Sequence, residues 1–234
     1  MGKPLERLLK KSRVLRKLSL EYNELMGHGT KFLAQGIQRN ASLEYLNIKG
    51  NVIGDNGIIL LAQALSNAPK LKELDISLNE IGPTGFRVLC EALPDTNLQT
   101  LVCNKNFLKD EILEYFAAVI TGDGNGATKL KKFDFSSCRL NDAGLIYIVN
   151  ALERNKHISQ IRLCDNFFSE QIEAMMLETL NKNTTLTEIG LQGNRFSHSC
   201  LAKIKKIANR NVKMIEEQEP NKLKAEIYKL RYEH

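Results

Sequence analysis

The stretch Leu71-Lys-Glu-Leu74-Asp-Ile76-Ser-Leu-Asn79 decides the fold, because its spacing occurs seven times along the chain. In each copy, apolar residues stand eight, five and three positions before an asparagine, or before a cysteine in one copy. These final residues are Asn23, Asn51, Asn79, Asn106, Cys138, Asn166 and Asn194, at steps of 28, 28, 27, 32, 28 and 28. A nearly constant period of this size is typical of stacked units, so we expect one elongated domain.

Each copy predicts a short strand followed by a helix. The second and third apolar residues flank one outward residue, which is the period of a strand with one buried face. The asparagine follows where the chain must bend, and its amide can pair backbone groups that stacking would otherwise leave without partners. A cysteine can occupy the same position as a weaker donor. Apolar residues then recur at helical steps, as Ile58, Leu61 and Leu65 do in the second copy.

On these residues the chain resembles leucine-rich-repeat proteins of the ribonuclease-inhibitor type, whose units have about this length. The resemblance covers residues 15 to 210. It implies an α/β fold: a curved solenoid of seven repeats, with parallel β-strands on the concave face and α-helices on the convex face. The stretch from Asn183 to Asn194, followed by a helix and a charged tail, is also similar to repeat domains of centrosomal and ciliary, or axonemal, proteins.

The N-terminal residues and one internal stretch depart from the repeat. In residues 1–14, Leu5, Leu8 and Leu9 fall where helix residues fall in the second copy, so this segment predicts a capping helix or the helix of a truncated repeat. The solenoid is expected over residues 15–210. Within it, the glycine-rich stretch 121–129 accounts for the 32-residue step as an insertion.

The C-terminal residues depart from the repeat as well. A last repeat helix is expected over residues 201–208, and residues 211–234 form a charged tail. In the tail, Leu223, Ile227 and Leu230 have heptad-like spacing. One heptad fits a short capping helix, and it also fits the root of a coiled coil or a partner-binding helix.

Positive charge is confined to the two ends of the chain. The net charge is +6, of which residues 1–20 carry +6 and residues 201–234 carry +4, leaving −4 for residues 21–200. A mildly acidic solenoid is a poor surface for a nucleic acid, so we expect none as a partner. No apolar run approaches 18 residues and no signal-peptide pattern opens the sequence, so we expect a cytoplasmic protein without membrane insertion. Five cysteines fit reduced, buried thiols better than a disulfide framework.

No pattern of catalytic or metal-binding residues stands out. His28, His157, His198 and His234 lie in different copies, and none has a second histidine or cysteine at ligand spacing. The glycine-rich stretch 122–126 is not followed by Lys-Ser or Lys-Thr, as a phosphate-binding loop would be. We therefore expect a protein that is not an enzyme and that takes no metal, cofactor or small-molecule substrate.

The candidate binding residues are those that point outward from the concave face. Tyr22, Tyr45 and Leu78 are the candidate anchors, because large side chains contribute much of the energy of an interface. The full set is Tyr22, Tyr45, Asn47, Lys49, Glu73, Asp75, Leu78, Asn104, Lys105, Lys132, Asp134, Arg162 and Asp165. The two ends of the solenoid and its convex face are alternative surfaces.

The function that this pattern favours is a non-catalytic protein–protein interaction scaffold within a larger complex. The resemblance implies docking in a cytoskeletal assembly at the centrosome, cilium or flagellum. Three alternatives stay open: the repeat domain of an innate-immune sensor or of an effector, a GTPase-activating protein of the Ran type, and an actin-capping domain of the tropomodulin kind. The Ran type is expected to carry an acidic tail, whereas this tail is basic, and no actin-binding helix is recognisable.

Overall fold

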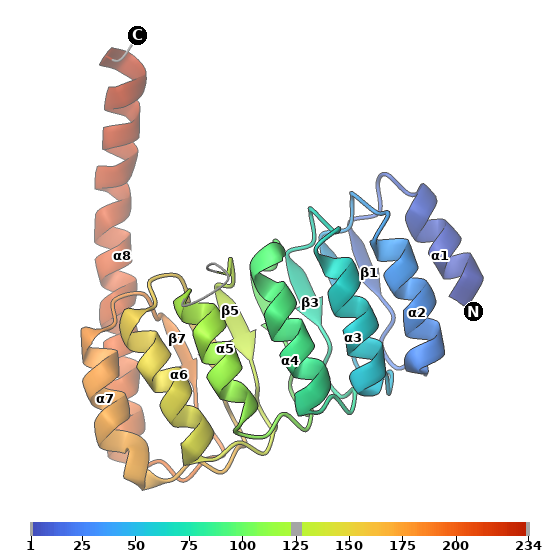
Figure 1. The fold of residues 1–234 in the computed structure, drawn as a ribbon. Helices are drawn as coiled ribbons and strands as arrows, with labels where there is room; N and C mark the ends of the chain where they lie inside the picture. Colours follow the sequence, from blue (N-terminus) through green and yellow to red (C-terminus); the bar gives the residue numbers. More distant parts are fainter. Residues whose placement is uncertain (1, 123–127, 233–234) are drawn as a thin grey trace.

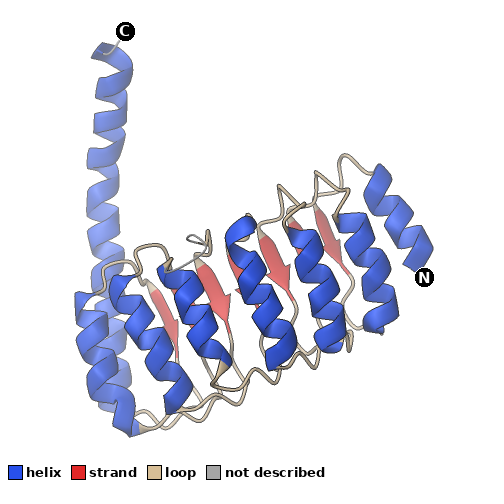
Figure 2. Ribbon diagram, in the orientation of Figure 1, coloured by secondary structure: helices blue, strands red, loops and turns tan. Residues whose placement is uncertain are grey.

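The computed structural model describes residues 2–122 and 128–232, with side chains as far as residue 218. Strands and helices alternate along the chain, and the repeats stack side by side into a solenoid (Figure 1). The strands form one layer and the helices the other, while the last helix extends beyond the solenoid (Figure 2). The predicted α/β leucine-rich-repeat architecture is therefore confirmed.

The strand layer is a single open sheet in which every neighbouring pair is parallel. Its order is the order of the chain, and equivalent residues of successive repeats lie side by side, as Leu18, Leu46 and Leu74 do. The strands are β1 (Lys17–Ser19), β2 (Tyr45–Asn47), β3 (Glu73–Asp75), β4 (Thr100–Val102), β5 (Lys132–Asp134), β6 (Gln160–Arg162) and β7 (Glu188–Gly190).

The helices form a second layer that covers one side of the sheet. Successive helices pack against each other, beginning with α1 on α2. The helices are α1 (Gly2–Lys11), α2 (Met26–Ile37), α3 (Gly54–Leu65), α4 (Pro83–Ala92), α5 (Ile112–Thr121), α6 (Asp142–Arg154), α7 (Glu173–Lys182) and α8 (His198–Tyr232), with short 3₁₀ turns at Leu93–Asp95 and Glu170–Ile172.

The core lies between the two layers and runs the length of the solenoid. The middle residue of an inner strand is almost fully buried, as Leu46, Leu101 and Ile161 are at 0% exposure. Near the centre, Phe116 packs edge-on against Phe135, with ring centroids 4.7 Å apart. Each repeat buries its apolar residues against the next, so the repeats share one continuous core.

From the second strand on, the asparagine that follows a strand connects its repeat to the one before it. Asn79 Oδ1 accepts hydrogen bonds from the N–H groups of Asn51 at 3.0 Å and Ile53 at 3.4 Å. Its Nδ2 donates to the carbonyls of Ile48 and Ser77, each at 2.9 Å. Because all of these groups are buried, the side chain pairs backbone groups that water cannot reach. We call this series of residues the asparagine ladder.

The ladder has one weaker step at Cys138. The thiol there donates to the carbonyl of Cys103 at 3.3 Å, and it receives a hydrogen bond from the backbone of Asn106. In the next repeat Asn166 has the usual pattern, with Oδ1 accepting from the Cys138 N–H at 3.0 Å. The cysteine therefore takes the place of an asparagine with a weaker donor and acceptor.

The residue before each ladder position has a left-handed backbone. The φ angles at these seven positions lie between 53° and 74°. Only Gly50 and Gly193 are glycines, and the other residues are Tyr22, Leu78, Lys105, Ser137 and Asp165. Side chains larger than glycine are strained in this conformation, so the stacked repeats on both sides must hold the turn in place.

The structure differs from the sequence expectation at the C-terminus. A repeat helix was expected over residues 201–208 with a separate tail from residue 211, whereas α8 runs without interruption from His198 to Tyr232. In the two preceding repeats the helix ends just before Asn155 and Asn183. Asn211 stands one period after Asn183, but here the helix continues through it.

Two expectations lie partly outside the described residues. The side chains of Leu223, Ile227 and Leu230 lie beyond residue 218, so the heptad-like pattern stays a prediction. The expected insertion at residues 121–129 includes residues 123–127, which also fall outside the description. Before them, α5 ends with Gly122 in a left-handed cap at φ 79°.

Candidate protein-binding surfaces

The predicted binding residues line up in rows across the concave face, because the strands are parallel and in register. Neighbouring strands lie about 4.8 Å apart, so equivalent side chains of successive repeats are close neighbours. The exposed members are Tyr22, Glu73, Lys105, Lys132, Arg162 and Asp165, and the half-buried members are Tyr45, Lys49, Asp75, Leu78, Asn104 and Asp134. Asn47 is buried, with 5% of its surface exposed.

Asn47 organises the first part of this face. Its Nδ2 donates to Glu21 Oε1 at 2.7 Å and to the Tyr45 hydroxyl at 3.2 Å. Its Oδ1 accepts from the backbone N–H of Lys49 at 3.0 Å. Asn47 therefore positions its neighbours and has little free surface of its own for a partner.

Tyr22 is the most exposed aromatic residue of the predicted set, with 63% of its surface exposed. It stands in one of the left-handed turns, and its ring lies directly against Gly50, where a Cβ atom would come within 2.5 Å of the ring. The ammonium group of Lys49 lies 5.7 Å from the ring centroid. We call this polar and aromatic surface the aromatic cluster; its members are Tyr22, Tyr45, Asn47 and Lys49. Gly50 supports the ring of Tyr22, and Asn47 supports Tyr45.

Asp75 and Asp134 use part of their carboxylate within the protein. Oδ1 of Asp75 accepts from the Ser77 N–H, and Oδ1 of Asp134 accepts from the Ser136 N–H, both at 2.9 Å. Asn104 also lies 3.4 Å from Asp134 Oδ2. Both aspartates therefore have a local structural role at the ends of their strands, and only Asp75 keeps its second oxygen without a hydrogen bond to a described residue.

Arg162 is partly neutralised by a residue of the next strand. Its Nε and Nη2 both donate to Glu188 Oε1, at 3.0 and 2.7 Å. This hydrogen bond raises the pKa of Arg162 above its ordinary value. In contrast, Glu73, Lys105, Lys132 and Asp165 have no side-chain hydrogen bond or ion pair with another described residue, so these charges are free to meet a partner.

Sequence reasoning missed a second row of exposed residues, at the position just after the ladder. Phe107 is 42% exposed and Phe167 is 62% exposed. Between them in repeat order, Arg139 places its guanidinium 4.7 Å from the Phe107 ring centroid. The available signal was an aromatic residue at a position where the other repeats carry Glu24, Val52, Glu80 or an arginine.

The C-terminal end of the solenoid carries a hollow of about 450 Å³ between β7 and α8. Its lining includes Ile189, Leu201 and Ile204 together with Lys205. Nearby, Arg210 donates to the carbonyls of Asn181 at 3.1 Å and Asn183 at 2.8 Å, at the end of α7. These bonds hold the first part of α8 against the last repeat.

The chemistry of the described residues offers little reactivity. Cys90, Cys103, Cys138 and Cys200 are buried, and burial raises the pKa of Cys138 to about 12 and that of Cys200 to about 11. Thiols with such pKa values are protonated at neutral pH and are poor nucleophiles. Within residues 2–122 and 128–232, no group of histidine, cysteine or acidic side chains could hold a metal ion. No helix in the same ranges is long and apolar enough to cross a membrane.

Comparison with known proteins supports the repeat assignment. The family described as Leucine Rich repeat matches residues 39–62, 67–90 and 126–149. A search of curated proteins gave no match. Among solved structures, a tropomodulin C-terminal domain from Caenorhabditis elegans is similar at 13% identity, with a TM-score of 0.45, covering 94% of this chain and 98% of that one. The actin-binding site 2 of leiomodin-1 is similar at 11% identity, with a TM-score of 0.38, and 95% of each chain is covered.

Proposed function

We propose, on the premise that this chain is a leucine-rich-repeat protein, that it is a non-catalytic scaffold which binds a protein partner on its concave face. Solenoids of this kind present long, curved binding surfaces, and their repeats hold the surface rigid. We further propose that the partner belongs to a cytoskeletal assembly at a centrosome, cilium or flagellum, in keeping with the sequence resemblance stated above.

The aromatic cluster is the observation that supports this proposal best. An exposed tyrosine with a cation nearby is typical of the residues that dominate protein interfaces. Tyr22 is packed against Gly50, and Tyr45 is hydrogen-bonded to Asn47, so neither ring must be ordered on binding. Such preorganisation lowers the entropy cost of association. The free charges of Glu73, Lys105 and Lys132 extend the surface toward the middle repeats.

The test is affinity purification or proximity labelling from the native cell with the double variant Tyr22→Ser and Lys49→Glu. A matched control exists on the convex side, where the guanidinium of Arg87 lies 4.8 Å from the ring centroid of the exposed Tyr115. The control is therefore Tyr115→Ser with Arg87→Glu, which removes an aromatic ring and a cation from the opposite face. Both variants should keep the far-UV circular dichroism and the unfolding temperature of the parent.

We expect the concave variant to lose its main partner and the convex variant to keep it. The loss of an interface anchor is worth about 2 kcal/mol, or roughly a 30-fold weaker affinity. If the concave variant keeps the full partner list while the convex variant loses it, the concave face is not the binding surface. Cosedimentation with microtubules and with actin filaments tests the cytoskeletal part, and a partner list without cytoskeletal proteins would contradict that part alone.

A further inference from the structure

The N-terminal end of the solenoid has an open sheet edge. Inside the sheet, the backbones of Tyr45 and Asn47 face the preceding strand, since the Leu20 N–H donates to the Asn47 carbonyl at 2.8 Å and the Tyr45 N–H donates to the Arg16 carbonyl at 3.0 Å. Lys17 and Ser19 are the equivalent residues one repeat earlier. Their N–H and C=O groups therefore point away from β2. Among the described residues no strand lies there, because β1 pairs only with β2 and α1 packs on α2.

The core is also incompletely covered at this end. Leu15, Leu18 and Leu20 are only half-buried. Their equivalents in the next repeat, Leu43, Leu46 and Ile48, are at most 3% exposed. The difference arises because α1 covers the helix layer of the first repeat but leaves its strand layer uncovered (Figure 1).

The asparagine ladder is open at the same place. In the second repeat, Asn51 Oδ1 accepts from the N–H groups of Asn23 and Leu25, and its Nδ2 donates to the Leu20 carbonyl, all in the preceding repeat. Asn23 itself is exposed and donates only to the carbonyl of Glu21, at 2.8 Å. No described residue donates to its Oδ1. The Oδ1 atom of Asn23 is therefore available to accept a hydrogen bond from a strand placed before β1.

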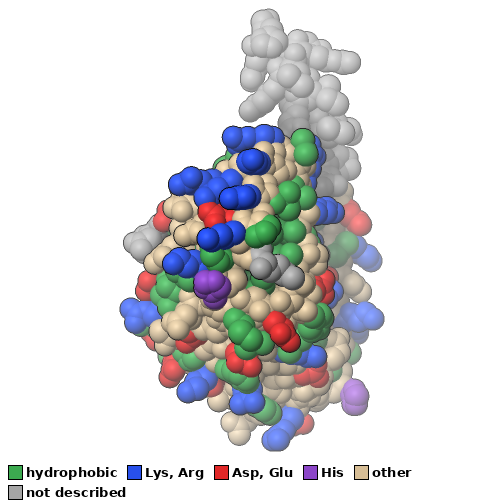
Figure 3. Space-filling model, turned by 90° about the vertical axis from the view of Figure 1, so that its right-hand side faces the viewer, with side chains coloured by type: hydrophobic (Ala, Val, Ile, Leu, Met, Phe, Trp, Pro, Cys, Tyr) green, Lys and Arg blue, Asp and Glu red, His purple; other side chains and the backbone are tan. Residues whose placement is uncertain are grey.

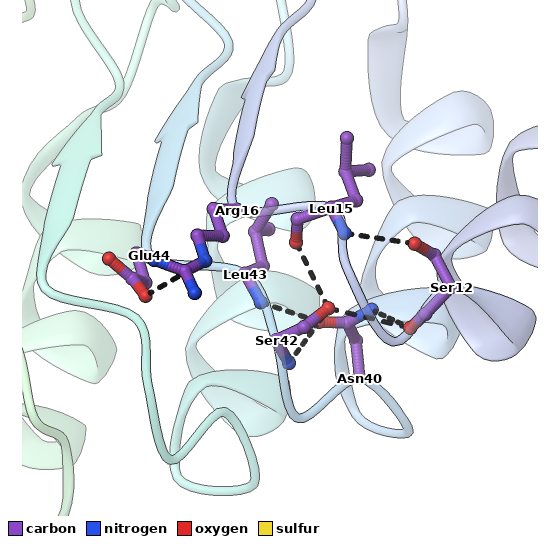
Figure 4. A network of polar contacts seen from close by, with 7 residues as sticks. All are labelled: Ser12, Leu15, Arg16, Asn40, Ser42, Leu43 and Glu44. Carbon is purple, nitrogen blue, oxygen red and sulfur yellow. Dashed lines mark hydrogen bonds and ion pairs between the residues drawn. The ribbon is translucent and has the colours of Figure 1, made fainter.

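The open edge is held in a fixed shape by hydrogen bonds to the second repeat. Figure 4 shows the network in which the Ser42 hydroxyl donates to the Leu15 carbonyl at 3.0 Å and the Leu15 N–H donates to Ser12 Oγ at 3.0 Å. Asn40 Nδ2 also donates to the Leu9 carbonyl at 2.7 Å, at the end of α1. The segment that leads into β1 is therefore already ordered for binding.

The charge around this edge indicates which occupant fits. Figure 3 views the N-terminal end and shows lysine and arginine side chains gathered toward its upper part, with apolar side chains among them. The exposed cations without an ion pair to a described residue are Lys3, Arg7, Lys11, Arg13 and Lys17. Val14, in the loop before β1, is 85% exposed. The C-terminal end of a second copy is a poor occupant, because residues 201–234 carry +4 and residues 1–20 carry +6.

We propose that this edge binds an extended, acidic segment of a partner protein, which adds to the sheet as a parallel strand beside β1. Main-chain hydrogen bonds to Lys17 and Ser19 would provide affinity, as they do in other cases of strand addition. Alternate apolar residues of the segment would cover Leu18 and Leu20, and its backbone N–H would donate to Asn23 Oδ1. The surface lies at the end of the solenoid, so this inference does not depend on binding at the aromatic cluster.

The experiment uses the full chain and a labelled peptide with the sequence of residues 71–81 as probe. This peptide carries the repeat spacing, includes the ladder residue Asn79 and has a net charge of −2. Binding is measured by fluorescence anisotropy, with a scrambled peptide of the same composition as control. Ser19→Pro is the decisive variant, since proline removes the outward N–H and is tolerated on an edge strand. Ser19→Ala is its matched control, and circular dichroism checks that both variants are folded.

We expect the repeat peptide to bind at least about tenfold more tightly than the scrambled peptide. Ser19→Pro should abolish that difference and Ser19→Ala should keep it, while Asn23→Ala should weaken binding about fivefold. Equal binding of the two peptides, or unchanged binding to Ser19→Pro, would overturn the proposal. The proposal would also be overturned if the chain bound duplex RNA or anionic lipid vesicles but not the repeat peptide, because charge without strand pairing would then explain the basic end.

Discussion

Replacing Asn79 with alanine should cost far more stability than the same change at Asn23, although both residues hold the same position in their repeats. Asn79 is fully buried and makes four hydrogen bonds to the backbone. Its removal leaves the N–H groups of Asn51 and Ile53 buried without an acceptor. At about 1–3 kcal/mol for each orphaned buried group, the expected loss is about 4 kcal/mol. This is a large part of the 5–15 kcal/mol that a folded domain typically has.

Asn23 has almost nothing to lose by comparison. It is exposed, and its side chain makes a single bond, to the Glu21 carbonyl at 2.8 Å. Since water can replace that bond, Asn23→Ala should cost about 0.5 kcal/mol. The two variants remove the same atoms from the same kind of turn, so the difference between them measures the ladder contacts alone.

Urea unfolding followed by far-UV circular dichroism gives the free energies, and hydrogen exchange locates the effect. In Asn79→Ala, the amides of Asn51 and Ile53 should exchange much faster than in the parent protein. Repeat arrays can unfold in parts, so the exchange data show whether the loss begins at this repeat. A cost for Asn79→Ala within 1 kcal/mol of that for Asn23→Ala would refute the view that the ladder holds the repeats together.

Three further predictions rest on contacts described above or on the packing of single residues. Gly85→Ala would place a Cβ atom 2.8 Å from the backbone of the preceding helix and should lower the free energy of unfolding in urea by about 1–3 kcal/mol. In Gly27→Ala the new Cβ atom meets nothing within 4 Å, so the free energy of unfolding should rise by about 0.5–1 kcal/mol. Equal effects of the two variants would contradict this packing. Arg210→Ala should cost about 1–2 kcal/mol and speed amide exchange at the start of α8; unchanged exchange would mean that its bonds to α7 contribute nothing. Burial raises the pKa of Cys138 from 9.0 to about 12, so between these two pH values the folded state keeps the thiol proton while the unfolded state loses it. The contribution of this thiol to stability should therefore be constant below pH 9 and fall between pH 9 and 12. Urea midpoints measured across that range should show the fall, and Cys138→Ser should reduce it.

The fold could be predicted from the sequence because stacking leaves little freedom at the repeated positions. Leu74 and Ile76 must face the core and Asn79 must pair with its neighbour, so the spacing defines the strand and the turn together. All seven strands lie where the alternation placed them. The course of α8 was less predictable, because the residues around Asn211 do not show whether the helix ends there or continues.

The candidate surface was predictable in its direction but not in its contacts. Alternation along a strand tells which side chains point outward, but the partner of each depends on a repeat about 28 residues away. Asn47 is buried because Glu21 and Tyr45 close over it. Arg162 is paired because its side chain reaches diagonally to Glu188, the register partner of Gln160 on the next strand. The left-handed turns gave no signal at Leu78, since leucine is rarely found in that conformation.

The direction of the ladder bonds has a consequence for synthesis of the chain. From the second repeat on, each ladder asparagine supplies partners to the backbone of the repeat before it, as Asn51 does for Asn23 and Leu25. A ribosome makes the earlier repeat first, so its turn stays unpaired until the next asparagine has emerged. The ladder contacts of the nascent protein can therefore form only one repeat behind the repeat that is being synthesised.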